Sequence, residues 1–175
     1  MTLGAKTPVR GILLVVDVQN GFVSEATSHV VGEIRDLIQE HEFDQVVFTR
    51  YINKEGGPYT RFLNWKRLMA PPETDIVSEL RPFAKTVIEK CVYTAWGAEL
   101  AALIREHSTS TVYIAGIDTD CCVLTSATDL FQQGIKPMVL LNYCASNGGP
   151  RSHDAAAVVL TRLIGDAQIL RGKFQ

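Results

Sequence analysis

The chain alternates short apolar runs with stretches whose apolar residues recur every three or four positions. The runs are rich in valine and isoleucine and do not alternate with polar residues. This pattern is typical of strands covered on both faces of a parallel sheet. It predicts strands at Gly11–Val18, Gln45–Tyr51, Thr86–Lys90, Thr111–Ile117, Lys136–Asn142 and Ala167–Leu170.

Helical spacing fills several of the intervals between these runs. The predicted helices cover Val30–Ile38, Leu100–Ile104, Val123–Gln133 and His153–Ile164, the last with a proline just ahead of it. Strand and helix alternate over the whole length, which predicts an α/β fold, a three-layer α-β-α sandwich around a mainly parallel, roughly six-stranded sheet. No linker interrupts the pattern, so we expect a single domain spanning residues 1–175.

The charge balance and the short first apolar run argue against nucleic acid and membranes as partners. The 175 residues include 17 basic and 19 acidic side chains without a basic run, so we expect no nucleic-acid binding. The first apolar run is stopped by Asp17 and is too short for a membrane span or a signal sequence. We therefore expect no membrane association and a cytoplasmic protein.

The cysteines and histidines do not form a recognisable metal site. Cys91, Cys121, Cys122 and Cys144 have no C-x-x-C spacing, and the four histidines are scattered. In a reducing compartment the cysteines should be free thiols. We expect neither a metal nor another cofactor.

Candidate chemistry gathers at the predicted carboxyl ends of the strands, where open α/β sheets bind ligands. Asp17 closes the first run, Lys90 closes the third, and Cys122 begins the helix after the fourth. Polar, glycine-bearing loops at 53–58 and 145–150 follow the second and fifth strands. A helix N-terminus and an ammonium group both lower a thiol pKa, so the three side chains together would form a nucleophilic site.

Each of these residues also has an ordinary structural interpretation. Asp17 fits a turn or cap, a lysine at the end of a strand is usually solvated, and a free cysteine is usually buried and inert. Composition and spacing alone therefore establish an α/β domain with a candidate thiol site.

Three segments carry a more specific signal. They read VDVQNGF at 16–22, EKCVYTAW at 89–96 and GIDTDCCV at 116–123. In this order they resemble the motifs D-x-Q-x-x-F, K-x-x-Y-S-A-F/W and G-x-x-T-D-x-C-V-x-x-T-A of the isochorismatase-like cysteine hydrolase superfamily. The tail at 125–127 is a near match, and Thr94 keeps a hydroxyl where the family often has serine.

The resemblance implies a role for each residue of the thiol site. The family's nucleophile is the cysteine immediately before valine, which is Cys122 here. Cys121 then fills a variable position and is expected to be a packing residue. Asp17 matches the general base or proton shuttle, and Lys90 matches the residue that stabilises the thiolate.

The resemblance also implies an oxyanion hole and pocket walls. Family members have a non-proline cis peptide in the G-x-x-T segment, at Ile117–Asp118 here, which would direct the amides of Asp118 and Cys122 at one oxyanion. The aromatic motif residues are candidates for substrate-binding walls, although aromatic residues near strand ends are as often part of the core. They are Phe22, Tyr93 and Trp96.

Departures from the family pattern narrow the range of expected substrates. Nicotinamidases of the family have T-x-D-x-H after the second strand, where the acid and the histidine hold a metal. This chain has Tyr51 and Asn53 at those two positions, which disfavours both a metal and nicotinamidase activity. Arg50 and Asn53 are therefore candidates for binding a substrate carboxylate or carbonyl, or Arg50 belongs to a surface or subunit-interface ion pair.

The resemblance, with these departures, implies a metal-independent cysteine hydrolase that cleaves a C–N bond (amide, ureido or N-carbamoyl) of a small molecule through a thioester. Members that cleave the vinyl ether of isochorismate generally lack the thiol, so this alternative ranks lower. A non-catalytic binding subunit and a redox-active thiol protein on the same fold are further alternatives.

Family members commonly form dimers or higher oligomers whose loops help to close the pocket, so a homo-oligomer is expected. The segment Arg61–Met69 carries several large apolar residues outside the motifs and is a candidate interface. A short helix packed on its own core is the alternative.

Overall fold

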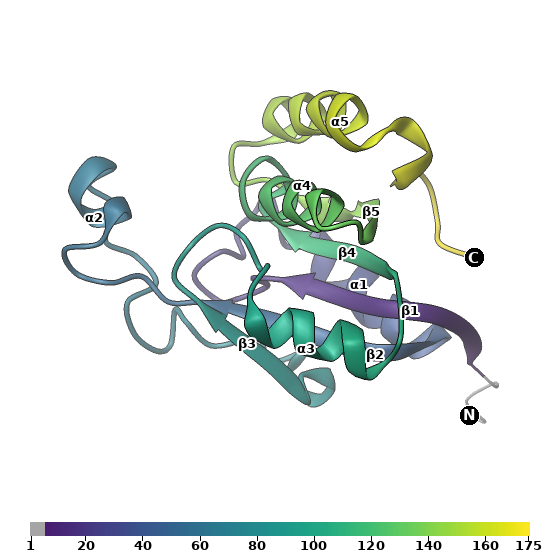
Figure 1. The fold of residues 1–175 in the computed structure, drawn as a ribbon. Helices are drawn as coiled ribbons and strands as arrows, with labels where there is room; N and C mark the ends of the chain where they lie inside the picture. Colours follow the sequence, from purple (N-terminus) through teal and green to yellow (C-terminus); the bar gives the residue numbers. More distant parts are fainter. Residues whose placement is uncertain (1–5) are drawn as a thin grey trace.

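The structure, a computed structural model, describes residues 6–175 and contains one sheet of parallel strands (Figure 1). The strand order in this part of the chain is β3-β2-β1-β4-β5-β6. The predicted α/β fold with a parallel six-stranded sheet is thus confirmed. The strands are β1 (Thr7–Val16), β2 (His41–Tyr51), β3 (Thr86–Lys90), β4 (Thr111–Ile117), β5 (Lys136–Ala145) and β6 (Ile169–Leu170).

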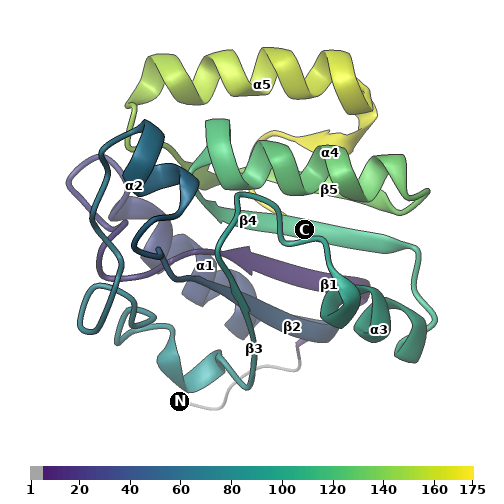
Figure 2. The same cartoon turned by 60° about the vertical axis from the view of Figure 1, so that its left-hand side comes forward.

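Helices cover both faces of the sheet (Figures 1 and 2). The first, α1 (His29–Glu40), lies on one face, and α3 (Ala98–Glu106), α4 (Leu124–Gln132) and α5 (Pro150–Ile164) lie on the other. The shorter helical segments are α2 (Pro58–Phe62), η1 (Arg81–Phe83), η2 (Thr119–Val123) and η3 (Asp166–Gln168). No helix of residues 6–175 is long and apolar enough to cross a membrane.

The first strand explains why the apolar runs are continuous. Leu13 and Val15 pack against α1, whereas Ile12, Leu14 and Val16 belong to the core under α3, α4 and α5. All five side chains are fully buried. A strand with helices on both faces buries both of its sides, so it shows no alternation with polar residues.

Several strand ends differ from the predicted ones. The first strand starts at Thr7 and the fifth continues to Ala145, because backbone hydrogen bonds to their neighbours extend beyond the apolar residues. The last strand is shorter than predicted, because Asp166–Gln168 forms a 3₁₀ turn. Hydrogen-bond ladders need no particular side chain, so an apolar pattern locates the middle of a strand better than its ends.

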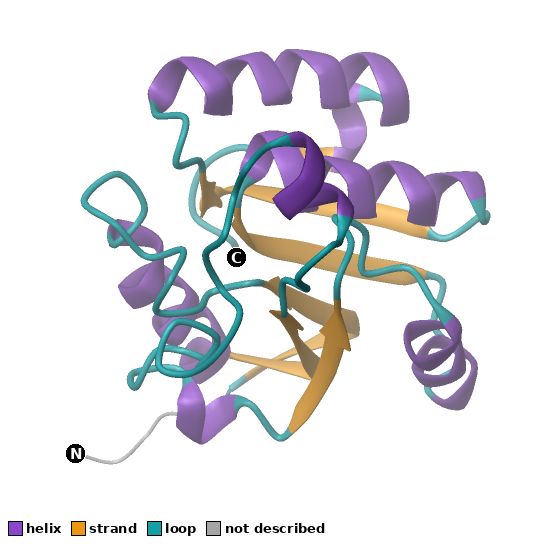
Figure 3. Ribbon diagram, turned by 90° about the vertical axis from the view of Figure 1, so that its left-hand side faces the viewer, coloured by secondary structure: helices purple, strands orange, loops and turns teal. Residues whose placement is uncertain are grey.

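The topology creates a crevice at the carboxyl edge of the sheet. From β1 the chain proceeds outward to β2 and β3, and it then returns to β4 on the other side of β1. Ligand sites of open α/β sheets lie at such a switch point. Figure 3 looks onto this edge, where loops from several strands gather.

Candidate active site

Three polar side chains from distant parts of the sequence meet at this edge. Asp17 directly follows β1, Lys90 ends β3, and Cys122 lies in η2, the single π-helical turn between β4 and α4. Asp17 has a left-handed backbone with φ 50°, a conformation that aspartate tolerates better than most residues. The side chains of Asp17 and Lys90 are 0% and 5% exposed, so water screens their charges very little.

Lys90 connects the acid to the thiol. Its Nζ lies 2.6 Å from Asp17 Oδ2 and 3.5 Å from Cys122 Sγ. It also donates to the carbonyl oxygens of Val92 and Tyr93, both at 3.0 Å. These contacts fix the ammonium group between the carboxylate and the sulfur.

The other oxygen of Asp17 is held by Thr49. The Thr49 hydroxyl donates to Asp17 Oδ1 at 2.6 Å and accepts from the Asp17 amide at 3.0 Å. Thr49 is fully buried in β2. This pair of bonds orients the carboxylate toward Lys90, and sequence reasoning did not identify Thr49 as part of the site.

The pKa of the Cys122 thiol is raised, whereas the sequence predicted a lowered one. Burial raises the pKa of Cys122 well above its ordinary value, and the charge of Asp17 raises it further, while Lys90 acts in the opposite direction. Burial lowers the pKa of Lys90, but the charges of Asp17 and Cys122 outweigh this effect and the net pKa is raised. The resting site thus holds a protonated thiol beside an ion pair, and the expected lowering of the Cys122 pKa is wrong because burial dominates.

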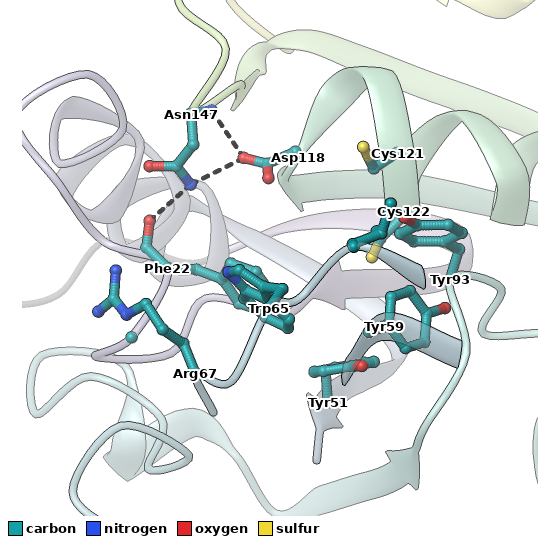
Figure 4. A pocket seen from close by; sticks show the side chains of 12 residues that line it. Phe22, Tyr51, Tyr59, Trp65, Arg67, Tyr93, Asp118, Cys121, Cys122 and Asn147 are labelled. Atoms are coloured by element: carbon teal, nitrogen blue, oxygen red, sulfur yellow. Dashed lines mark hydrogen bonds between the residues drawn. The ribbon is translucent and has the colours of Figure 1, made fainter. Parts of the chain in front are cut away.

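Cys122 lies at the edge of a cavity of about 360 Å³ (Figure 4). Much of its wall is aromatic, with Tyr59 5.4 Å from Tyr51 and 5.0 Å from Tyr93 between ring centroids. Phe22 stacks on Trp65 at 5.9 Å. The lining residues are Gly21, Phe22, Tyr51, Tyr59, Leu63, Trp65, Arg67, Tyr93, Asp118, Cys121, Cys122 and Asn147. The cavity has the size of a small-molecule site.

Two of the five predicted substrate-binding residues, Phe22 and Tyr93, line this cavity. Arg50 lies elsewhere and forms an ion pair with Glu89 on the neighbouring strand β3, as in the surface alternative. Trp96 packs against the core under α3 and α4. Side chains of adjacent strand residues point to opposite faces, which takes Arg50 away from the crevice that its neighbour Tyr51 reaches.

Asn53 lies behind the cavity wall and supports it. Its Nδ2 donates to the carbonyl oxygens of Trp65 at 2.9 Å and Arg67 at 3.1 Å. Its Oδ1 accepts from the Lys54 amide at 2.9 Å. A buried amide that joins two loop segments in this way orders the wall of the cavity rather than contacting a ligand.

Several lining residues were missed by the sequence analysis. Tyr51, Tyr59 and Trp65 come from β2, α2 and the following loop, and Asn147 comes from the glycine-bearing loop after β5. The only available signal was the position of these loops after strands. Cys121 was expected to be a packing residue, but it borders the cavity, and burial raises its pKa to about 11.

The turn before Cys122 has the expected cis peptide bond between Ile117 and Asp118. The amides of Cys121 and Val123 both donate to the Asp118 carbonyl oxygen at 3.1 Å. These two amides are therefore engaged, and the amides of Asp118 and Cys122 remain the predicted oxyanion hole.

The residues at the nicotinamidase metal positions have other partners. The Tyr51 hydroxyl donates to Asn53 Oδ1 at 3.3 Å, and burial raises the pKa of Tyr51. Within residues 6–175 no three histidine, cysteine, aspartate or glutamate side chains come together as metal ligands. The donor set at these two positions does not fit a divalent cation, which prefers imidazole and carboxylate ligands.

The candidate interface segment divides into two parts. Leu68 is fully buried in a small core with Tyr51 and Tyr59. In contrast, Phe62 and Leu63 are 74% and 61% exposed. The helix and loop therefore pack partly on their own chain, and an oligomeric interface here remains a prediction.

The sequence model of the isochorismatase domain matches residues 11–167, which is most of the chain. This protein belongs to the isochorismatase family. The predicted membership of this hydrolase family is therefore confirmed.

Two curated relatives of this chain are distant in sequence. The isochorismatase family protein PncA of Bacillus subtilis is 28% identical over 149 residues, which cover 73% of this chain and 81% of the relative. Enterobactin synthase component B of Escherichia coli is 27% identical over 153 residues. That match covers 79% of this chain but only 53% of the relative, so this chain spans about half of that protein.

Solved structures share the fold. An isochorismatase-like hydrolase from Alkaliphilus metalliredigens aligns with a TM-score of 0.78 at 19% identity, covering 89% of this chain and 92% of the other. N-carbamoylsarcosine amidase from Thermoplasma acidophilum aligns with a TM-score of 0.74 at 24% identity, covering 91% and 93%. At these identities the likeness establishes the isochorismatase-like fold alone.

Proposed function

We propose that this isochorismatase-family protein is a metal-independent cysteine hydrolase. It cleaves the C–N bond of a small amide, urea or N-carbamoyl compound through a thioester on Cys122. The observation that carries the proposal is the position of Lys90 Nζ, 2.6 Å from Asp17 Oδ2 and 3.5 Å from Cys122 Sγ, beside a cavity of about 360 Å³. One of the similar folds belongs to N-carbamoylsarcosine amidase, which is consistent with this reaction class.

The raised pKa of the Cys122 thiol determines the first step. A thiol that is protonated at rest must lose its proton as it attacks, and Asp17, which Lys90 holds on the same side as the sulfur, accepts that proton. The Cys122 sulfur then bonds to the substrate carbonyl carbon. Lys90 stabilises the negative charge on sulfur during the attack.

The remaining steps balance the atoms and return the site to its starting state. The carbonyl oxygen becomes an oxyanion held by the amides of Asp118 and Cys122. Asp17 gives its proton to the leaving nitrogen as the C–N bond breaks. Water then attacks the thioester with Asp17 as base, and the proton taken from water returns to the sulfur as the C–S bond breaks.

The structure of the thiol site argues against a peroxide sensor. Oxidation of cysteine follows the population of thiolate and its exposure. Cys122 is 3% exposed and its pKa is raised, so both conditions are unfavourable. A nucleophile whose proton is removed only when substrate is bound fits the hydrolase better.

The test is a panel of small amides, ureas and N-carbamoyl compounds, assayed for release of ammonia or amine. Cys122→Ser should abolish release, whereas Cys121→Ser, the adjacent thiol at the same cavity, should retain it. Rapid quenching followed by peptide mass spectrometry should find the acyl group on Cys122, and a chelator should leave the rate unchanged. Full activity in Cys122→Ser would refute the mechanism.

A further inference from the structure

The cavity contains a carboxylate that has no part in the proposed chemistry. Asp118 directly follows β4 and lines the cavity together with Cys122 and Tyr93 (Figure 4). The proposed mechanism uses only its backbone amide.

Asn147 fixes the orientation of this carboxylate. The Asn147 amide and Nδ2 both donate to Asp118 Oδ1, at 2.8 Å and 2.9 Å. Asn147 itself is held, since Nδ2 also donates to the Phe22 carbonyl oxygen at 2.9 Å and Oδ1 accepts from Ser24 at 2.8 Å. Among the described residues none donates a hydrogen bond to Asp118 Oδ2, and Figure 4 shows this oxygen turned away from Asn147 on the cavity side.

The charges around the cavity leave Asp118 without a cation. Lys90 is paired with Asp17 at 2.6 Å, and Arg67 at the rim is paired with Glu73 at 3.0 Å. Within residues 6–175 no lysine, arginine or histidine lies within 4.0 Å of the Asp118 carboxylate. When Asp118 is ionised, the lining therefore carries one uncompensated negative charge.

The aromatic lining favours the same kind of ligand. The faces of aromatic rings attract cations through their quadrupole. The site already contains one example, with Lys90 Nζ 5.4 Å from the centre of the Tyr51 ring. The aromatic rings that line the cavity are those of Phe22, Tyr51, Tyr59, Trp65 and Tyr93.

We propose that Asp118 determines specificity by binding a positively charged nitrogen of the substrate through its free carboxylate oxygen. The substrate class that follows, which rests on the proposed function, is a small amide, urea or N-carbamoyl compound that also carries an ammonium group. Asn147 positions Asp118 for this contact. The aromatic rings surround the apolar part of the same molecule.

The ionisation of Asp118 should make the binding of a cation depend on pH. Burial raises the pKa of Asp118 to about 6, and the two hydrogen bonds from Asn147 oppose this rise. The site should therefore attract a cation above about pH 6 and lose the attraction below it. The other charged or titratable groups around Asp118 are Asp17, Asp120, Cys121, Cys122, Tyr93, Arg67 and Lys90.

Three small aromatic probes, one cationic, one neutral and one anionic, test the proposed contact without requiring catalysis. They are benzylamine, benzyl alcohol and benzoate, whose binding is measured by ligand-observed NMR and by tryptophan fluorescence, to which Trp65 contributes from the cavity wall. At about pH 7.5 the wild type should bind benzylamine at least about tenfold more tightly than benzyl alcohol, with benzoate weakest, as expected for a hydrogen bond to a charged group. Asp118→Asn should abolish the difference between benzylamine and benzyl alcohol.

A matched control and a pH series complete the design. Asp120→Asn removes the same charge from a neighbouring acid that binds the Ser146 hydroxyl and does not line the cavity, so it should leave the preference unchanged. In the wild type the preference should disappear at about pH 5, where benzylamine is still protonated. This arm requires no variant and therefore does not depend on how Asp118→Asn folds.

The outcomes separate this inference from the proposed function. Equal binding of benzylamine and benzyl alcohol by the wild type, or no binding of benzylamine, overturns the assignment of Asp118 even if amide hydrolysis is found. A preference for benzylamine that requires Asp118 supports the assignment even if every amide of the panel is inert. In that case only the catalytic proposal fails.

Discussion

Substitution of Lys90 by methionine should slow the alkylation of Cys122. The lysine side chain is 5% exposed and its Nζ lies 3.5 Å from the sulfur, so it is the cation that favours the thiolate. Methionine keeps most of the apolar volume and removes the charge. The pKa of Cys122 should therefore rise further above its ordinary value, and less thiolate should be present at any pH near neutrality.

The distance gives the size of the effect. Two unit charges at the 3.5 Å between Nζ and Sγ interact by about 5 kcal/mol at an effective dielectric constant of about 20. This energy corresponds to a factor of about 10³ in thiolate population. A more basic thiolate is also more nucleophilic, which restores about half of the effect on a logarithmic scale and leaves an alkylation rate about thirtyfold lower.

The assay is the rate of iodoacetamide labelling from about pH 6 to pH 10, located by peptide mass spectrometry. The wild-type rate at Cys122 should rise throughout this range without a plateau near neutrality, because the thiol pKa is raised. Cys91 is an internal reference in every sample, and Lys54→Met removes a charge from an exposed loop as a matched control. A change of less than about threefold in Lys90→Met would refute the electrostatic role of Lys90.

Substitution of Asp17 should change the alkylation rate of Cys122 in the opposite direction. The charge of Asp17 raises the pKa of Cys122, so Asp17→Asn should lower that pKa and make alkylation faster. Hydrolysis should nevertheless be lost, since no base then accepts the thiol proton. Slower alkylation in Asp17→Asn would contradict this account of the site.

Three further substitutions test the supports of the site. Thr49→Val removes the 2.6 Å hydrogen bond to Asp17 and should lower the free energy of unfolding, measured by urea titration, by about 1.5–3 kcal/mol. The kcat should also fall, and an unchanged stability would contradict the role of Thr49 in holding Asp17. Asn53→Ala removes the hydrogen bonds that hold the loop at 65–67 and should lower the free energy of unfolding by about 1–3 kcal/mol. It should also raise KM more than it lowers kcat, and an unchanged KM would show that the loop does not need these bonds. Gly116→Ala should abolish cooperative thermal unfolding, since its Cβ would overlap the backbone oxygen of Val16 in β1. A melting temperature within a few degrees of the wild type would contradict that.

The sequence by itself determined the fold and which side chains are candidates for the reaction. Continuous apolar runs separated by helical periodicity are sufficient for a parallel sheet with helices on both faces, because covering both faces removes polar alternation. Asp17, Lys90 and Cys122 each follow or end such a run. In a parallel sheet the carboxyl ends share one edge, so their meeting follows from topology.

Only the tertiary structure decided the electrostatics and the pocket. The pKa of Cys122 depends on how much water the fold removes from the sulfur, and no local pattern records this burial. The direction of the side chains at the end of β2 decides that Arg50 pairs with Glu89 and that Asn53 binds the loop of Trp65, so that neither lines the cavity. Asp118 keeps one carboxylate oxygen free because Asn147, in the loop after β5, binds only Oδ1, and the fold of that loop decides this. Loops carry few periodic signals, and the contacts they make are set by the rest of the fold.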